Sequence, residues 1–168
     1  MRMAGARAGI QISIVTAKHD NAVPVDLLTG TLSTDLAAQG IVAELGDPVG
    51  YIVTFTNGLT VYLSGDTGQT ADMAEVVRKQ YHAQLAVLNI GDNFTTGPEE
   101  AAYAANNLIQ PESVIPSHVN EVATNLGMVV AGSRTAEFMR LARAHVYLPL
   151  SGRTMQFDQR GRCTAGCN

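Results

Sequence analysis

Short runs of apolar residues alternate with polar segments along the chain, and each run predicts one secondary-structure element. Residues 10–17 are rich in Ile and Val and alternate loosely with polar positions, which predicts a strand. Two further runs, 51–55 and 59–63, flank the dipeptide Asn57-Gly58. This dipeptide supplies the positive φ angles of a tight turn, so the two runs predict an antiparallel hairpin.

Helical and strand-like segments then alternate toward the C-terminus. Helical spacing of apolar residues predicts a helix over 70–81, and Pro98 followed by two acids opens a second one over 98–109. The almost wholly apolar run 85–90 is typical of a strand buried on both faces. A third helix is expected over 135–144. Short strands are expected at 113–116, 145–148 and 154–157.

Strand–helix units combined with a hairpin predict an α/β (α+β) fold, in which helices pack on a mixed sheet. Residues 20–48 are polar, with scattered Gly, Pro and Asp and no periodicity, so a long loop is expected there. The length of 168 residues suits a single domain over 1–168.

Composition narrows the possible partners and the compartment. The net charge of -4 leaves no basic field for nucleic acid or anionic lipid, and no apolar run approaches the roughly 18 residues of a membrane span. Gln11 and Ser13 interrupt the apolar run after the basic N-terminus, so no signal peptide is predicted. Cys163 and Cys167 lack a second Cys or His pair and are interpreted as incidental thiols in a frayed tail. We therefore expect a cytoplasmic protein that binds neither nucleic acid nor a membrane.

Three residues with metal-binding side chains each follow a predicted strand: His19, Asp66 and His118. Ligands gather at the carboxyl edge of sheets in layered α/β folds, and two imidazoles with a carboxylate form a recognised catalytic zinc set. The alternative for each residue alone is a local turn-capping role. Their coincidence favours a metal site with Asp66 as the catalytic carboxylate.

The residues beside Asp66 support this interpretation. Gly65 and Gly68 allow a sharp turn close to a ligand, and Thr67 is expected to hold a carboxylate oxygen in support of the metal. His82 and His145 do not follow strand ends, so structural roles are expected for them.

Residues 50–120 resemble the metallo-β-lactamase superfamily, and within it the metal-dependent hydrolases related to the ascorbate-phosphate lactonase. The resemblance rests on the hairpin, Gly65-Asp66-Thr67-Gly68, the run from Asn89 to Ala102 and Ile115-Pro116-Ser117-His118. Residues 15–19 resemble that family's third-histidine strand, and 148–157 its closing hairpin. This family folds as an αββα sandwich around two metal ions, zinc or manganese, whose hydroxide hydrolyses lactones, esters or phosphoesters.

The resemblance implies that His19 binds one metal, that His118 binds the other and that Asp66 bridges both. The family's His-x-His-x-Asp-His motif, which supplies the remaining ligands, is absent, because no two histidines lie within five residues of each other. The chain thus resembles the C-terminal half of the sandwich, an incomplete fold with helices on one face of its sheet, and at most one ion is expected to bind it.

Three interpretations remain open. The chain is the C-terminal portion of a metal-dependent hydrolase with impaired activity on its own, or a non-catalytic half-sandwich that binds a partner or dimerises. The third is a mononuclear hydrolase that uses His19, Asp66 and His118 alone. The half-sandwich leaves apolar sheet surface uncovered, which predicts a homo-oligomer or a complementary subunit.

Overall fold

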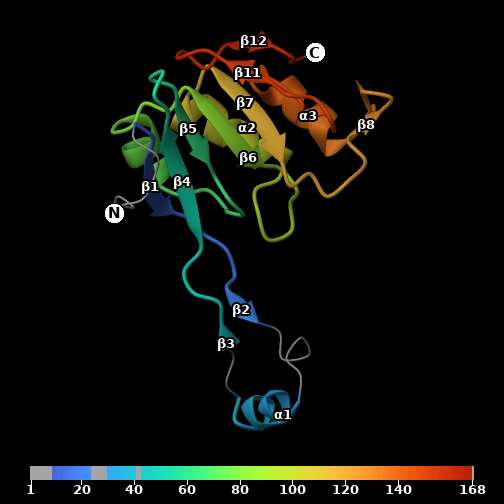
Figure 1. The fold of residues 1–168 in the computed structure, drawn as a ribbon. Coiled ribbons are helices and arrows are strands. Elements are labelled where there is room, and N and C mark those ends of the chain that lie inside the picture. Colours follow the sequence, from blue (N-terminus) through green and yellow to red (C-terminus); the bar gives the residue numbers. More distant parts are fainter. Residues whose placement is uncertain (1–8, 24–29, 41–42, 168) are drawn as a thin grey trace.

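The computed structural model describes residues 9–23, 30–40 and 43–167, and a six-stranded sheet lies at its centre (Figure 1). The strand order is β1-β4-β5-β6-β7-β10. β4 pairs antiparallel with β1 and β5, whereas the remaining pairs are parallel, so the predicted mixed sheet is confirmed. The strands are β1 (Gln11–Thr16), β4 (Val49–Thr54), β5 (Thr60–Leu63), β6 (Leu85–Asn89), β7 (Ser113–Ser117) and β10 (His145–Val146).

The hairpin between β4 and β5 forms as predicted, with Tyr51 opposite Leu63. Its turn differs in detail from the expected one. Gly58 has a φ of +90°, whereas Asn57 keeps a negative φ and accepts a hydrogen bond from the Leu59 N–H through its side chain (3.1 Å). The connection is therefore a longer loop in which only the glycine adopts the left-handed conformation.

All the helices that follow β5 pack on one face of the sheet. They are the π-helical η2 (Met73–Arg78), α2 (Pro98–Tyr103), the π-helical η3 (Ala104–Ile109) and α3 (Arg134–Leu141). One core joins them to the sheet, because fully buried Tyr62 of β5 belongs to the same apolar cluster as Val77 of η2 and Phe138 of α3. The small residues Ala101 and Ala105 let the helices over 98–109 lie close to their neighbours. The expected helices on one face are thereby confirmed.

The described residues of the segment 20–48 form an arm that stands off the body of the protein (Figure 1). A two-stranded ladder of β2 (Ala22–Val23) and β3 (Ala43–Glu44) forms its stem, and the helix α1 (Thr31–Ala38) lies beyond it. The expectation of a long loop is therefore wrong for β2, α1 and β3. Strands of two residues are too short to show an alternation of apolar and polar positions, so these strands leave no signal in the sequence. Residues 24–29 and 41–42 of that expectation lie outside the described residues.

The C-terminal segment forms a hairpin of its own, in which β11 (Gln156–Phe157) pairs with β12 (Cys163–Ala165). The Arg162 guanidinium joins it to the body through Glu112 (Nε–Oε1, 2.9 Å). Cys163 and Cys167 form a disulfide across a Cα–Cα distance of 6.2 Å. The expected frayed tail with incidental thiols is therefore wrong. So is the closing hairpin over 148–157, because β10 joins the main sheet and β11 pairs with β12.

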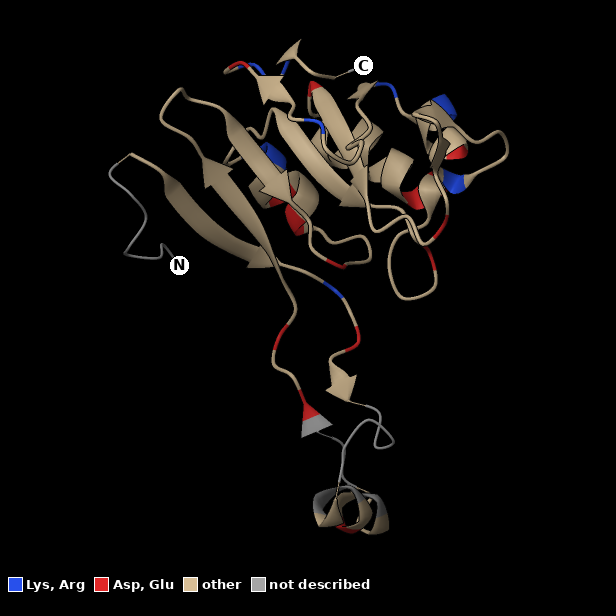
Figure 2. Ribbon diagram, turned by 45° about the vertical axis from the view of Figure 1, so that its right-hand side comes forward, with Lys and Arg blue, Asp and Glu red and all other residues tan. Residues whose placement is uncertain are grey.

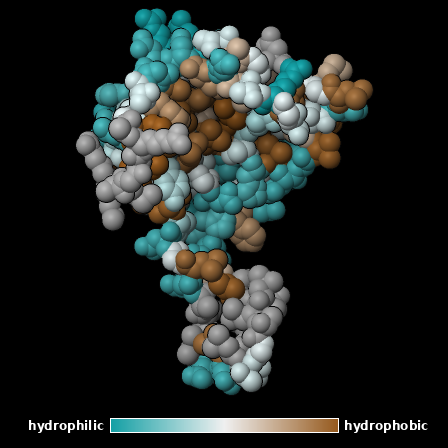
Figure 3. All heavy atoms as spheres, viewed as in Figure 1, coloured by the Kyte–Doolittle hydropathy of each residue, from teal (hydrophilic) through white to brown (hydrophobic). Residues whose placement is uncertain are grey.

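The face of the sheet opposite the helices is apolar and only partly covered. None of the six strands contains Lys, Arg, Asp or Glu, and Figure 2 shows the charged residues on helices, on loops and on β3 of the arm. Figure 3 shows a hydrophobic area across this face. Phe157 of the C-terminal hairpin covers one end of it, while Leu63 stays 37% exposed. We call this surface the outer face; its cluster consists of Leu59, Val61, Leu85, Val87, Ile115 and Phe157.

Another short hairpin, β8 (Thr124–Asn125) with β9 (Met128–Val129), lies between β7 and α3. No helix among the described residues is long and apolar enough to cross a membrane.

Candidate metal centre

Strand direction brings the candidate ligands to one edge of the sheet. β1 is antiparallel to β4, which is antiparallel to β5, so β1 runs in the same direction as β5, β6 and β7. The carboxyl ends of these four strands therefore meet at one edge, and His19, Asp66 and His118 lie in the segments that follow three of them. Ligands bind at this edge in α/β folds.

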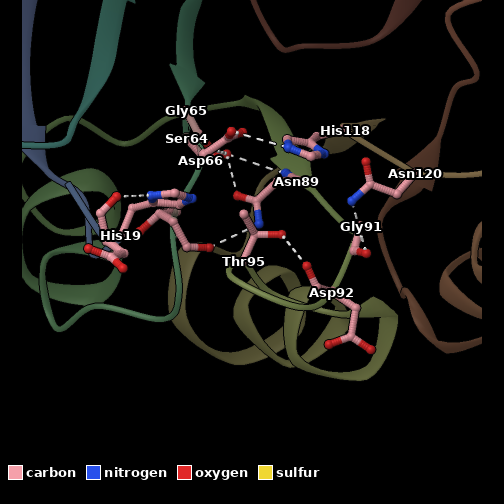
Figure 4. Close-up of polar contacts among 12 residues, drawn as sticks. His19, Ser64, Gly65, Asp66, Asn89, Gly91, Asp92, Thr95, His118 and Asn120 are labelled. Carbon is pink, nitrogen blue, oxygen red and sulfur yellow. Dashed lines mark hydrogen bonds and ion pairs between the residues drawn. The ribbon is translucent and has the colours of Figure 1, made fainter. Parts of the chain in front are cut away.

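Asp66 and His118 are in direct contact at this edge (Figure 4). His118 Nε2 lies 3.2 Å from Asp66 Oδ2, and the two side chains are 37% and 48% exposed. Two ligand atoms at tetrahedral zinc, each about 2.0–2.1 Å from the ion, lie about 3.3 Å apart. The observed separation thus suits two ligands of one ion as well as a hydrogen bond between them.

His19 lies at the same edge but does not join this pair. Its backbone neighbour Lys18 is fixed to the loop that carries Asp66, because the Lys18 N–H donates to Thr67 Oγ1 and the Lys18 carbonyl accepts from Gly68 N–H (both 2.8 Å). The His19 ring itself has Nδ1 2.5 Å from the Asp20 carbonyl oxygen. Among the described residues, no group of three or more His, Cys, Asp or Glu lies close enough together to hold a metal ion.

The Gly65–Gly68 loop owes its shape to close backbone packing. Gly65 has a φ of +61°, and a Cβ there would lie 2.8 Å from the Val49 carbonyl oxygen, so a side chain is excluded. Thr67 is fully buried, and its hydroxyl donates to the Gly68 carbonyl (2.7 Å) while accepting from Lys18. Thr67 therefore anchors the loop to the segment that follows β1. The sequence had instead led us to expect a contact between Thr67 and the Asp66 carboxylate.

A buried asparagine to which the sequence analysis assigned no role connects the edge loops. Asn89, 1% exposed at the end of β6, donates through Nδ2 to the Thr67 carbonyl (2.9 Å) and to Thr96 Oγ1 (2.8 Å). Its Oδ1 accepts from the Ser64 hydroxyl (3.1 Å). The only sequence signal was a polar residue at the end of an apolar strand. This network holds the 64–67 and 91–97 loops in fixed positions relative to each other.

The backbone around His118 is also closely packed. His118 adopts a left-handed φ of +44°, which is uncommon for a residue with a side chain and is often found at functional sites. Its carbonyl oxygen lies where a Cβ on Gly91 would be, so only glycine fits at position 91. Asn120 Nδ2 donates to the Gly91 carbonyl (3.3 Å) and closes the contact between the two loops.

The other two histidines lie at the opposite edge of the sheet. His82 precedes β6 and His145 begins β10, so both lie at the amino ends of the parallel strands. His145 stacks on Tyr147, with ring centroids 6.4 Å apart. Neither histidine lies at the edge that carries Asp66 and His118.

Comparison with known proteins agrees with this architecture. No family model matches the chain. A "UPF0173 metal-dependent hydrolase" from Roseiflexus sp. (strain RS-1) is 41% identical over 111 residues, which cover 66% of this chain and 39% of the relative. The protein of the same description from Polynucleobacter asymbioticus is 32% identical over 152 residues, covering 89% of this chain and 48% of the relative.

Solved structures share the fold. The metallo-β-lactamase fold protein YhfI from Bacillus subtilis superimposes with a TM-score of 0.57 at 11% identity, covering 90% of this chain and 51% of that one. The metallo hydrolase Igni18 from Ignicoccus hospitalis gives a TM-score of 0.53 at 27% identity, covering 84% and 51%. The described part of the chain has the metallo-β-lactamase fold, and in sequence the chain is similar to proteins described as metal-dependent hydrolases.

The chain spans about half or less of the length of these relatives and solved structures. These similarities establish the fold of the described part, whereas activity, substrate and partners of the whole protein are matters for proposal.

Proposed function

We propose that this chain supplies part of the metal site of a metal-dependent hydrolase, which acts on a small molecule containing a lactone, ester or phosphoester. The observation that carries the proposal is the Asp66–His118 contact at the carboxyl edge of the sheet, 3.2 Å between Oδ2 and Nε2. The fold and the relatives described as metal-dependent hydrolases support it.

The donors on this chain fit a metal ion only in part. A catalytic zinc site keeps three protein ligands, and Asp66 and His118 provide two. His19 is the third ligand that we propose, and it would have to turn its ring away from the Asp20 carbonyl. A two-metal site, as the resemblance implies, needs further ligands, and we infer that these come from protein beyond these 168 residues. This chain by itself binds at most one zinc or manganese ion.

A metal titration tests this proposal. Calorimetry with ZnCl2 should detect weak binding of no more than one ion per chain, and Asp66→Asn or His118→Gln should abolish it. His82→Gln serves as the matched control, since His82 lies at the opposite edge of the sheet. Binding that survives both Asp66→Asn and His118→Gln would remove the proposed site.

Activity should follow the same pattern. The isolated chain should show no more than trace zinc- or manganese-dependent hydrolysis, because its ligand set is incomplete. Robust turnover of a lactone or phosphodiester that vanishes in Asp66→Ala would instead favour a mononuclear hydrolase that needs no further ligands.

The outer face favours a second function, that of a non-catalytic half-sandwich whose role is association. An apolar sheet face of this kind normally needs cover, and here the C-terminal hairpin covers only one end (Figure 3). Light scattering combined with the zinc titration distinguishes the association module from the hydrolase. A stable dimer that binds no zinc favours the association module, and a chain that binds zinc favours the hydrolase.

A further inference from the structure

A cavity of about 210 Å³ lies beside His118, outside the Asp66–His118 contact. It is formed where the end of β7, the strand β8, the start of α3 and the segment 148–151 meet. His118 belongs to both places, since it is one of the residues that line the cavity while its Nε2 faces Asp66. A group held in this cavity would therefore lie next to the candidate metal centre.

The cavity wall is uncharged and largely aliphatic. None of the described residues that line it is Lys, Arg, Asp or Glu, and His118 is its one titratable group. A charged group placed there would lose hydration without meeting a permanently charged partner in the wall, which is unfavourable, whereas hydrocarbon would gain from leaving water. The apolar part of the wall consists of Pro116, Val119, Ala123, Leu148, Pro149 and Leu150.

Hydrogen bonds hold the walls in place. The N–H of fully buried Thr135 donates to Glu121 Oε1 (3.1 Å), which directs that carboxylate to the start of α3. Ser133 caps the same helix by accepting from the Ala136 N–H (3.0 Å). On the opposite side, a Cβ on Gly127 would lie 3.7 Å from Leu150 Cδ1, so the turn between β8 and β9 packs against the segment 148–151. The cavity is therefore built by the fold and does not depend on a ligand.

We propose that this cavity binds a short, uncharged aliphatic group of the substrate. The inference rests on the proposed hydrolase function. It narrows the substrate class to compounds that carry such a group next to the bond that is cleaved, and it disfavours phosphorylated sugars. At about 30 Å³ for each water-sized group, the volume accommodates about seven non-hydrogen atoms.

A homologous series of neutral ligands tests the proposal by NMR. Linear amides from propanamide to decanamide are titrated into the metal-free ¹⁵N-labelled chain, and the shifts of the Val119, Thr124 and Leu150 amide signals are followed. Affinity should rise about fourfold for each added methylene until the cavity is full, and then level off. The carboxylates of the same chain lengths should bind at least tenfold more weakly.

Two substitutions change the cavity in opposite directions. Ala123→Phe should fill it and weaken hexanamide binding at least tenfold, whereas Leu150→Ala should enlarge it and move the plateau to longer amides. Val122→Phe introduces the same ring at the neighbouring, exposed position, which does not line the cavity, and should leave binding unchanged.

Equal binding of hexanamide and hexanoate, affinity that does not depend on chain length, or an Ala123→Phe chain that binds like Val122→Phe would overturn the proposal. The zinc titration is a separate measurement. Loss of zinc binding with intact amide binding would reject the hydrolase and leave a plain apolar site, whereas the converse would reject only the cavity's role.

Discussion

Replacing Asn89 by Ala should destabilise the protein because it removes the centre of the edge network. Three side-chain hydrogen bonds are lost, to the Thr67 carbonyl, to Thr96 Oγ1 and from the Ser64 hydroxyl. Each contributes about 1 kcal/mol net in a buried setting, so the free energy of unfolding should fall by about 3 kcal/mol. No partner is left wholly unpaired: the Thr67 carbonyl, for example, still accepts from the Thr96 N–H (3.0 Å). The desolvation penalty of an orphaned group therefore does not add to this figure.

Thermal unfolding followed by circular dichroism measures the loss. For a chain of 168 residues, 1 kcal/mol corresponds to about 2–4 °C in Tm, so Asn89→Ala should lower Tm by about 6–12 °C. Asn107→Ala is the matched control, because Asn107 is exposed on η3 and makes a single side-chain bond, to the Tyr103 carbonyl (3.1 Å). The control should change Tm by no more than about 2 °C.

The same variant reports on the site. Since Asn89 fixes the loop that carries Asp66, zinc binding should weaken in Asn89→Ala and stay unchanged in Asn107→Ala. An Asn89→Ala chain that unfolds within about 2 °C of the wild type would refute the reasoning, because the three bonds would then contribute nothing measurable.

Three further outcomes are expected. Burial, with a smaller effect of Asp72, raises the pKa of Tyr62, so the free energy of unfolding should fall as the pH rises above about 10, where the unfolded chain ionises and the folded one does not. Tyr62→Phe should remove that fall in alkaline unfolding curves. It should change the free energy of unfolding little at pH 7, since the hydroxyl has no hydrogen-bond partner among the described residues. A decrease of more than about 2 kcal/mol at pH 7 would contradict this, because it would mean that the hydroxyl is hydrogen-bonded. The wild type should self-associate or bind a hydrophobic dye in light-scattering and fluorescence assays, and Val87→Asp on the outer face should reduce both, whereas Val122→Asp at an exposed loop position should not; a monomer without dye binding would contradict this. Gly91→Ala should lower Tm and shift the His118 NMR signals, because its Cβ would overlap the His118 carbonyl oxygen; an unshifted His118 would show that the contact is not obligatory.

The amino-acid sequence determined the elements whose signals are local. Asn57-Gly58 between two β-branched runs specifies a hairpin, and Pro98 with two acids specifies a helix start, because each depends on φ preferences and dipoles within a few residues. The apolar run 85–90 likewise predicted a central strand. A strand buried on both faces is continuously apolar, whereas a strand with one exposed face alternates apolar and polar residues. The order of these elements was sufficient to predict a mixed sheet with helices packed on it, and the family resemblance added that the helices cover one face.

Only the tertiary structure decided how residues distant in the chain meet. The direction of β1 relative to β5 placed His19, Asp66 and His118 at one edge, yet loop geometry joined Asp66 to His118 and turned His19 toward its neighbour's carbonyl. The role of Asn89 and the wall beside His118 could not be predicted from the sequence, because their partners lie up to about thirty residues away along the chain. Strand periodicity is a property of neighbouring residues, whereas a site is a set of distances across the fold. The sequence therefore indicated which metal-binding residues follow the strand ends, and packing determined which of these residues are in contact.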